Sequence, residues 1–120
     1  MKWKKLELIP LLELISEKSK EWNTENVIPK TLALGKIIKN QLDKYKDGNY
    51  RSDRNEIYGF FEAIEKFSAT QLPITLEHFQ SLITDYKKRI HPYPHYSGIV
   101  VSVPENLEDL YNPDSFEISN

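Results

Sequence analysis

Residues 57–67 read Ile-Tyr-Gly-Phe-Phe-Glu-Ala-Ile-Glu-Lys-Phe, and they carry the richest aromatic face of the chain. Apolar side chains that recur every three or four residues share one face of an α-helix. On this face the sequence places Ile57, Phe60, Phe61, Ile64 and Phe67. We therefore expect a helix here, with its apolar face at the centre of the hydrophobic core.

The start of this helix is predicted from Asp53, because Asp is a good N-cap residue and Glu56 follows three positions later, as in a capping box. The same periodicity predicts helices over residues 10–22 and 29–45 and from Thr75 to about residue 90. Proline at positions 10 and 29 suits the first turn of a helix, and Asp47-Gly48-Asn49 is a stop signal. Gly35, inside the second helix, predicts a close helix crossing.

The helical pattern ends near residue 91. Residues 98–103, Gly-Ile-Val-Val-Ser-Val, form the only strand-like run, because they are rich in β-branched side chains. This run either pairs with residues 93–96 in a small hairpin or packs as a lone extended arm, and a short helix over residues 105–111 follows. We expect an all-α fold, an antiparallel bundle of about four helices with a C-terminal appendage, in a single domain spanning residues 1–120.

Composition narrows the class of protein. The chain has 120 residues, 39% of them hydrophobic and 28% charged, which is typical of one globular domain. It contains no cysteine, and this excludes disulfides, thiolate nucleophiles and cysteine zinc sites. The basic start resembles a signal peptide, but Glu7, Pro10 and Glu13 interrupt the apolar stretch. We expect a cytoplasmic protein without a membrane partner, and the abundance of Ile, Lys and Asn indicates an AT-rich genome, bacterial or viral.

The net charge of −2 conceals an asymmetry along the chain. Residues 1–55 hold 12 basic and 8 acidic side chains, whereas residues 92–120 hold no Lys or Arg and five acidic side chains. Aromatic residues stand among these acids, and complementary charge with aromatic contact area is typical of protein interfaces. The C-terminal segment, packed on or beside the bundle, is thus a candidate partner-binding surface, with Tyr93, Tyr96, Glu105, Glu108, Asp109, Tyr111 and Asp114 as its site residues. The alternative is a solvated C-terminus that aids solubility.

The basic N-terminal half suggests a second binding role. Lys2, Lys4 and Lys5 surround Trp3, and further lysines follow one another along the second helix, at positions 36, 39, 44 and 46. A lysine-rich helix face can bind nucleic acid through its phosphates. Arginine is scarce, which disfavours readout of base edges. The alternative is a solvated helix face.

Catalytic motifs are absent: the sequence has no phosphate loop, no nucleophile elbow and no His-Glu-x-x-His zinc motif. The three histidines, His78, His91 and His95, lack the further ligands that a metal site needs. Glu56, Glu62 and Glu65 lie on the third helix, and Glu62 and Glu65 are paired carboxylates that could exchange protons or bind Mg²⁺, but a solvated flank beside the phenylalanine face is the better explanation. We expect no catalytic residues, no metal and no cofactor, and keep a small helical enzyme as the least favoured reading.

His91-Pro92 followed by Ser97-Gly98-Ile99-Val100 resembles a stretch of the small four-helix immunity proteins of nuclease colicins. That family presents acidic residues and tyrosines to a basic nuclease. The similarity lies within residues 91–100, its spacing differs, and the family's tyrosine-bearing Ser-Asp-Leu-Ile segment is absent, so no residue role is transferred. Small size, the lack of catalytic motifs and the acidic C-terminus together predict a non-catalytic protein-binding module. The most specific version is an immunity protein or antitoxin that neutralises a basic toxin or nuclease.

Overall fold

The computed structural model describes residues 2–22, 26–70, 74–90 and 98–107. Over these residues the chain is mostly helical, with one small antiparallel sheet. Its elements, in chain order, are β1 (Trp3–Glu7), α1 (Leu8–Ser19), α2 (Val27–Leu42), α3 (Gly48–Thr70), α4 (Leu76–Arg89) and β2 (Val100–Pro104). The four predicted helices are confirmed, but the expected all-α class is wrong, because the two ends of the described chain form a sheet.

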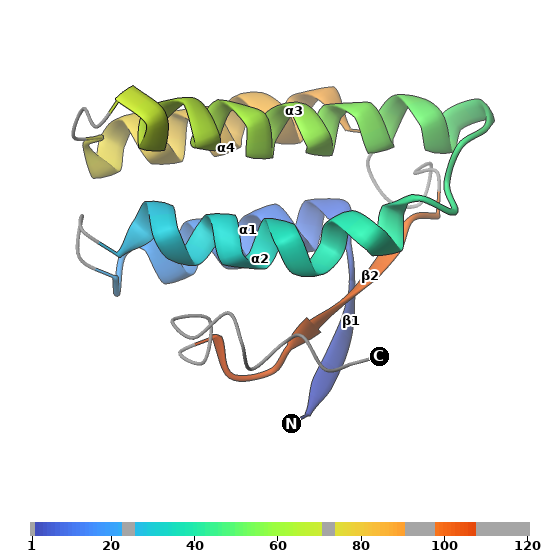
Figure 1. Ribbon diagram of the computed structural model, residues 1–120, viewed down its shortest axis with the longest axis horizontal. Helices are drawn as coiled ribbons and strands as arrows, with labels where there is room; N and C mark the ends of the chain where they lie inside the picture. Colours follow the sequence, from blue (N-terminus) through green and yellow to red (C-terminus); the bar gives the residue numbers. More distant parts are fainter. Residues whose placement is uncertain (1, 23–25, 71–73, 91–97, 108–120) are drawn as a thin grey trace.

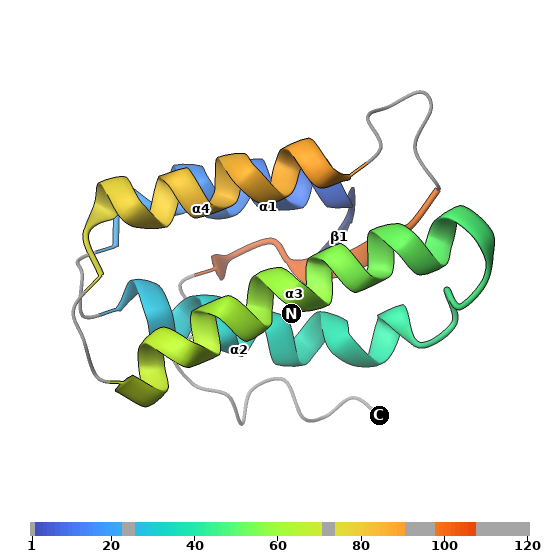
Figure 2. The same cartoon turned by 90° about the horizontal axis from the view of Figure 1, so that it is seen from above.

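The helices pack in a ring that the sheet completes. Helix α2 packs against α3, α3 against α4 and α4 against α1, while β1 lies against α1 and β2 against α2. Successive helices run in opposite directions, with α3 and α4 in one layer and α1 and α2 in the other (Figure 1). Seen from above, the strands lie between the α1–α4 pair and the α2–α3 pair (Figure 2).

The core is centred on the stretch that the sequence indicated. Ile57, Phe60 and Ile64 of α3 are fully buried, and Phe61 is nearly so. The ring of Phe60 lies edge-on to the rings of Phe61 and Tyr86, at centroid distances of 5.1 and 5.7 Å. This geometry suits the charge distribution of aromatic rings. The predicted core face of α3 is therefore confirmed.

Helix boundaries follow the predictions in part. Thr75 is the N-cap of α4, as expected, since its hydroxyl oxygen accepts a hydrogen bond of 3.0 Å from the backbone N–H of His78. The predicted start of α3 at Asp53 is wrong. The helix begins at Gly48, where φ is +59°, a backbone conformation that glycine adopts without strain. Asp53 is instead fully buried inside the helix.

Gly35 permits the close crossing of α2 and α3 that the sequence predicted. A Cβ atom at this position would lie 2.8 Å from Cδ1 of Phe61, closer than side chains tolerate. The absence of a side chain at Gly35 is therefore what lets the Phe61 ring rest on the backbone of α2.

The strand-like run is confirmed as β2, and the expectation that it packs as a lone extended arm is wrong. It pairs with β1 at the other end of the chain, antiparallel and in a register that sets Lys4 opposite Val103. It is therefore not a lone arm. Residues 93–96, which we expected to pair with it, lie outside the described residues, as does most of the predicted helix over residues 105–111.

Candidate binding surfaces around the sheet

One of the seven predicted site residues belongs to the part of the chain that the structure describes. Glu105 follows β2 directly and is exposed, and its backbone N–H donates a hydrogen bond of 2.9 Å to the carbonyl oxygen of Lys2. This bond extends the pairing of the two strands by one position. The remaining six lie outside the described residues: Tyr93, Tyr96, Glu108, Asp109, Tyr111 and Asp114.

The beginning of the acidic segment is built into the core. Ile99, Val101 and Val103 are buried, and Leu107 is 1% exposed beyond the end of the strand. Burial of an aliphatic side chain of this size contributes about 1.5–3 kcal/mol. Residues 98–107 are thus held firmly against the helices, and Glu105 projects from a fixed position.

The outer edge of β2 is closed by two side chains of the α2 region. Gln41 donates from its amide nitrogen to the Ser102 carbonyl at 2.9 Å and accepts from the Ser102 N–H at 2.7 Å. The hydroxyl of Tyr45 lies 3.3 Å from the carbonyl oxygen of Val100 and 3.4 Å from its nitrogen. These contacts take the place of a third strand, because they satisfy backbone groups that face away from β1.

Alternation along the sheet determines which backbone groups of β1 face outward. In an antiparallel pair, every second residue directs its N–H and C=O toward the partner strand. Since the backbone of Lys2 bonds to Glu105, the next residues whose backbone groups face β2 are Lys4 and Leu6. The backbone of Trp3, Lys5 and Glu7 therefore faces away from β2, and we call this row of groups the β1 edge.

The β1 edge is basic and exposed. Lys2, Trp3 and Lys5 are exposed, with 40% of the Trp3 surface accessible to solvent, and Lys4 is half-buried. Within the described ranges, no group forms a hydrogen bond with the backbone N–H or C=O of Lys5. The two edges of the sheet thus differ, since side chains close the β2 edge and leave Lys5 on the β1 edge open.

The predicted lysine-rich face of α2 and the turn after it is exposed at Lys36, Lys39, Lys44 and Lys46. The Lys44 ammonium lies 5.2 Å from the centre of the Tyr45 ring. Lys30, on the same helix, is only 4% exposed, and its ammonium lies 5.6 Å from the Trp22 ring centre. Sequence reasoning missed this buried lysine, although an amphipathic stem beside a tryptophan suits such a position.

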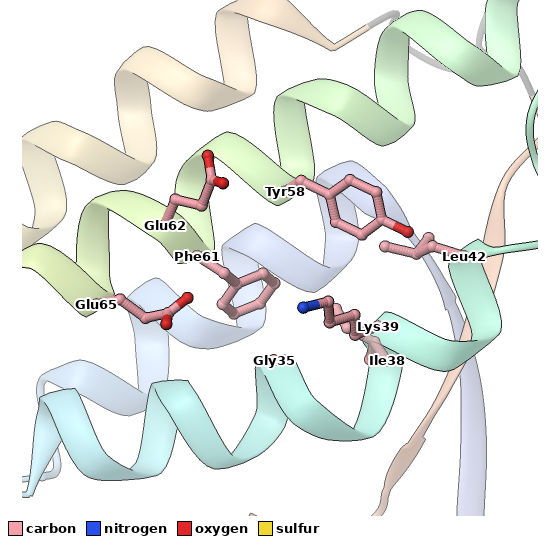
Figure 3. A pocket seen from close by; sticks show the side chains of 8 residues that line it. All are labelled: Gly35, Ile38, Lys39, Leu42, Tyr58, Phe61, Glu62 and Glu65. Atoms are coloured by element: carbon pink, nitrogen blue, oxygen red, sulfur yellow. The ribbon is translucent and has the colours of Figure 1, made fainter.

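A cavity of about 180 Å³ opens between α2 and α3. Its floor is apolar, with Ile38, Leu42 and Phe61, and Glu62 and Glu65 of α3 stand at its rim. The Lys39 and Glu65 side chains extend into the space between the two helices, whereas Glu62 points away from α2 (Figure 3). Of the carboxylates named in the sequence analysis, Glu65 therefore stands opposite Lys39, which lowers the positive potential of α2 here.

Tyr58 borders the same cavity, and its hydroxyl donates a hydrogen bond of 3.3 Å to Oδ1 of Asp43. Burial raises the pKa of the Tyr58 phenol above its usual value, and the negative charge of Asp43 raises it further. Arg54, whose guanidinium lies 5.6 Å from the Tyr58 ring centre, acts in the opposite direction on this pKa. The phenol is thus a neutral hydrogen-bond donor near neutral pH.

Groups that could support catalysis are dispersed among the described residues. Glu56 pairs with Arg89 at 3.7 Å, and the exposed His78 lies edge-on to Phe67 at a centroid distance of 5.0 Å. The described chain contains no cluster of three or more His, Cys, Asp or Glu side chains that could hold a metal ion. His91 and His95 lie outside it. None of the described helices is both long and apolar enough to cross a membrane.

Comparison of the chain with family models, with curated proteins and with solved structures finds no match. Functional reasoning therefore rests on the residues and geometry of this chain alone.

Proposed function

We propose that this protein is a small non-catalytic protein-binding module that acts through the end of the molecule around the sheet. The observation that carries the proposal is the firm anchoring of the acidic C-terminal segment. Ile99, Val101, Val103 and Leu107 are buried in the core, so that Glu105 stands at a fixed position beside the bundle. A solubilising tail does not need such an anchor, whereas an interface gains affinity from preorganisation.

The partner that suits this surface carries positive charge. No Lys or Arg occurs after residue 91, so the acids there meet no neighbouring cation along the chain. Complementary charge accelerates the encounter of two proteins and disfavours wrong partners. The most specific form of the proposal is an immunity protein or antitoxin, acting in the cytoplasm of a bacterium, that covers a basic toxin or nuclease.

The test uses the product of the adjacent gene as the candidate partner. We expect the two proteins to bind, as measured by calorimetry with the full chain. Charge reversal at Glu105, Glu108 and Asp109 should weaken binding by about 100-fold or more, as loss of several interfacial charge pairs does.

A matched variant distinguishes the effect of this surface on binding from the effect of net charge. Glu17, Glu62 and Asp85 are exposed acids on three helices of the bundle, and reversing all three changes the total charge by the same amount. At moderate salt, which screens long-range charge effects, we expect the affinity of this variant to lie within about threefold of that of the wild type. Equal losses in the two triple variants would contradict a localised acidic interface.

The alternative is a nucleic-acid-binding or regulatory protein that uses the lysines of α2. Exposure of Lys36, Lys44 and Lys46 favours it, whereas the carboxylate of Glu65 opposite Lys39 disfavours it. Affinity for duplex DNA should then fall steeply with salt, and no binding at low salt would exclude this alternative. A small helical enzyme is supported least, given the dispersed ionisable groups described above.

A further inference from the structure

The cavity between α2 and α3 combines an apolar floor with a charged rim. Its volume is about 180 Å³, and an apolar cavity of about 150 Å³ holds a benzene molecule. Phe61 is 9% exposed, whereas Ile38 and Leu42 also line the cavity and are fully buried. A side chain at Gly35 would displace the Phe61 ring, so the shape of the floor depends on this glycine. The cavity is therefore large enough for one small ring.

Lys39 and Glu65 place two opposite charges at the rim. Both side chains are exposed and extend into the space between the two helices (Figure 3). Within the described part of the chain, neither side chain forms an ion pair or a hydrogen bond. Glu62 points away from α2, so that it does not face Lys39. The cavity therefore offers one cation and one anion to a ligand.

This pair of charges favours a zwitterion. A ligand with only a carboxylate is attracted by Lys39 and repelled by Glu65, and a ligand with only an ammonium meets the opposite arrangement. An α-amino acid carries both groups on one carbon, and the long stems of the two side chains allow both to reach it. Hydrogen bonds between charged groups are stronger than those between neutral groups.

The rings beside the cavity favour an aromatic ligand. Phe61 and Tyr58 both line it, and aromatic rings attract one another in offset or edge-on arrangements. The Tyr58 hydroxyl donates its hydrogen bond to Asp43, which holds this ring beside the cavity. An added ring would therefore meet aromatic partners that are already in position.

We propose that the cavity between α2 and α3 binds a small aromatic α-amino acid. Its carboxylate pairs with Lys39, its ammonium pairs with Glu65, and its ring contacts Phe61. The site shares no residue with the acidic interface of the proposed function, so that neither depends on the other. If the cavity has no ligand, Lys39 and Glu65 are ordinary solvated charges, and the experiment below distinguishes the two cases.

The experiment titrates the full chain with L-phenylalanine and three analogues, followed by NMR. Phenethylamine lacks the carboxylate, 3-phenylpropanoate lacks the ammonium, and glycine lacks the ring. We expect phenylalanine to bind with a Kd of about 1 mM or below and to shift the amide signals of Gly35, Lys39, Phe61 and Glu65. Each analogue should bind at least about tenfold more weakly, because it loses one charged contact or the ring.

Two variants separate the two charges. Lys39→Gln should weaken the binding of phenylalanine by about tenfold and should not weaken that of phenethylamine, which has no carboxylate. Glu65→Gln should weaken the binding of phenylalanine similarly and should not weaken that of 3-phenylpropanoate. Lys36→Gln and Glu77→Gln are matched controls, since both residues are exposed and neither lines the cavity. Each control should change the affinity by less than about twofold, because distant charges are screened.

Three results would overturn the proposal. The first is the absence of amide shifts at about 10 mM phenylalanine, a concentration that reveals even weak association. The second is equal affinity for phenylalanine, phenethylamine and 3-phenylpropanoate, since the charges would then play no part in binding. The third is an equal effect of Lys39→Gln and Lys36→Gln, because the ligand would then respond to net charge and not to this site.

Discussion

At the scale of single residues, Gly35 sets the distance between α2 and α3. We expect Gly35→Ala to lower the free energy of unfolding by about 1–2 kcal/mol, measured by urea denaturation. The new Cβ would lie 2.8 Å from Phe61, and overpacking of this kind costs about 1–3 kcal/mol. The better helix propensity of alanine, about 1 kcal/mol, offsets part of this cost.

Gly59 is the matched control, because it also lies within a helix of the bundle. A Cβ there would come no closer than 3.4 Å to Tyr86, an ordinary contact distance. Gly59→Ala should therefore raise the free energy of unfolding by up to about 1 kcal/mol. Stabilisation by both substitutions would show that Phe61 moves aside easily and that the close crossing does not depend on Gly35.

Tyr58 makes the stability of the folded chain depend on pH in the alkaline range. Its pKa is raised in the folded chain, so the folded chain keeps this proton to higher pH than the unfolded chain does. Stability contributed by the neutral phenol is therefore complete below the ordinary pKa of about 10 and is lost as pH rises above it. We expect the wild type to lose stability more steeply than Tyr58→Phe in this range, as measured by denaturation at a series of pH values.

Asp43→Asn is the companion variant, because it keeps the shape of the side chain and removes the charge beside the phenol. It should lower the pKa of Tyr58 toward the ordinary value, and burial should keep part of the shift. Ultraviolet titration of the phenols, with Tyr58→Phe subtracted, follows this group among the seven tyrosines. An unchanged titration in Asp43→Asn would contradict the part assigned to the carboxylate.

At the scale of elements, Gln41 joins α2 to β2 as a third strand would. Gln41→Ala removes two hydrogen bonds to the backbone of Ser102, and we expect it to lower the free energy of unfolding by about 1–3 kcal/mol. Asn40→Ala, at an exposed neighbouring position, should change it by less than about 0.5 kcal/mol. Urea denaturation measures the free energy of unfolding of both variants. Equal effects would show that water replaces the amide of Gln41 without loss of stability.

The elements differ in how far sequence patterns predict them. The four helices follow from apolar periodicity, and the cap of α4 follows from Thr75. The start of α3 does not, because tertiary packing extends the helix back to Gly48 and buries Asp53 within it. Strand β1 escaped prediction because Trp-Lys-Lys-Leu-Glu lacks a clear apolar alternation, and only pairing with β2 orders it.

The candidate surfaces could be predicted only in outline. The concentration of acids after residue 91 is visible in the sequence, and so is the cluster of lysines around Trp3. The position of Glu105 beside Lys2 is not, because it depends on a pairing between residues about a hundred positions apart. Closure of the β2 edge by Gln41 and Tyr45 depends on the same pairing.

At the scale of the whole molecule, the sheet and the helices share one hydrophobic core. Val101 and Val103 are fully buried together with the apolar faces of the helices. We expect their amides to exchange with solvent only on global unfolding, with opening free energies within about 1 kcal/mol of those for Phe60 and Ile64. Native-state hydrogen exchange measures these values. If the opening free energies of the sheet amides were several kcal/mol lower than those of the helix amides, the sheet would be a separable appendage.

The pairing of β1 with β2 also bears on how the chain folds during synthesis. Trp3 leaves the ribosome about a hundred residues before its partner Pro104. At ordinary rates of translation, the nascent β1 therefore waits roughly 5–20 seconds before the strand that orders it exists. Helix contacts are local and form early, whereas this closure over the length of the chain comes last. Lysines on β1 then have a further benefit, because they keep a waiting strand from joining other nascent chains.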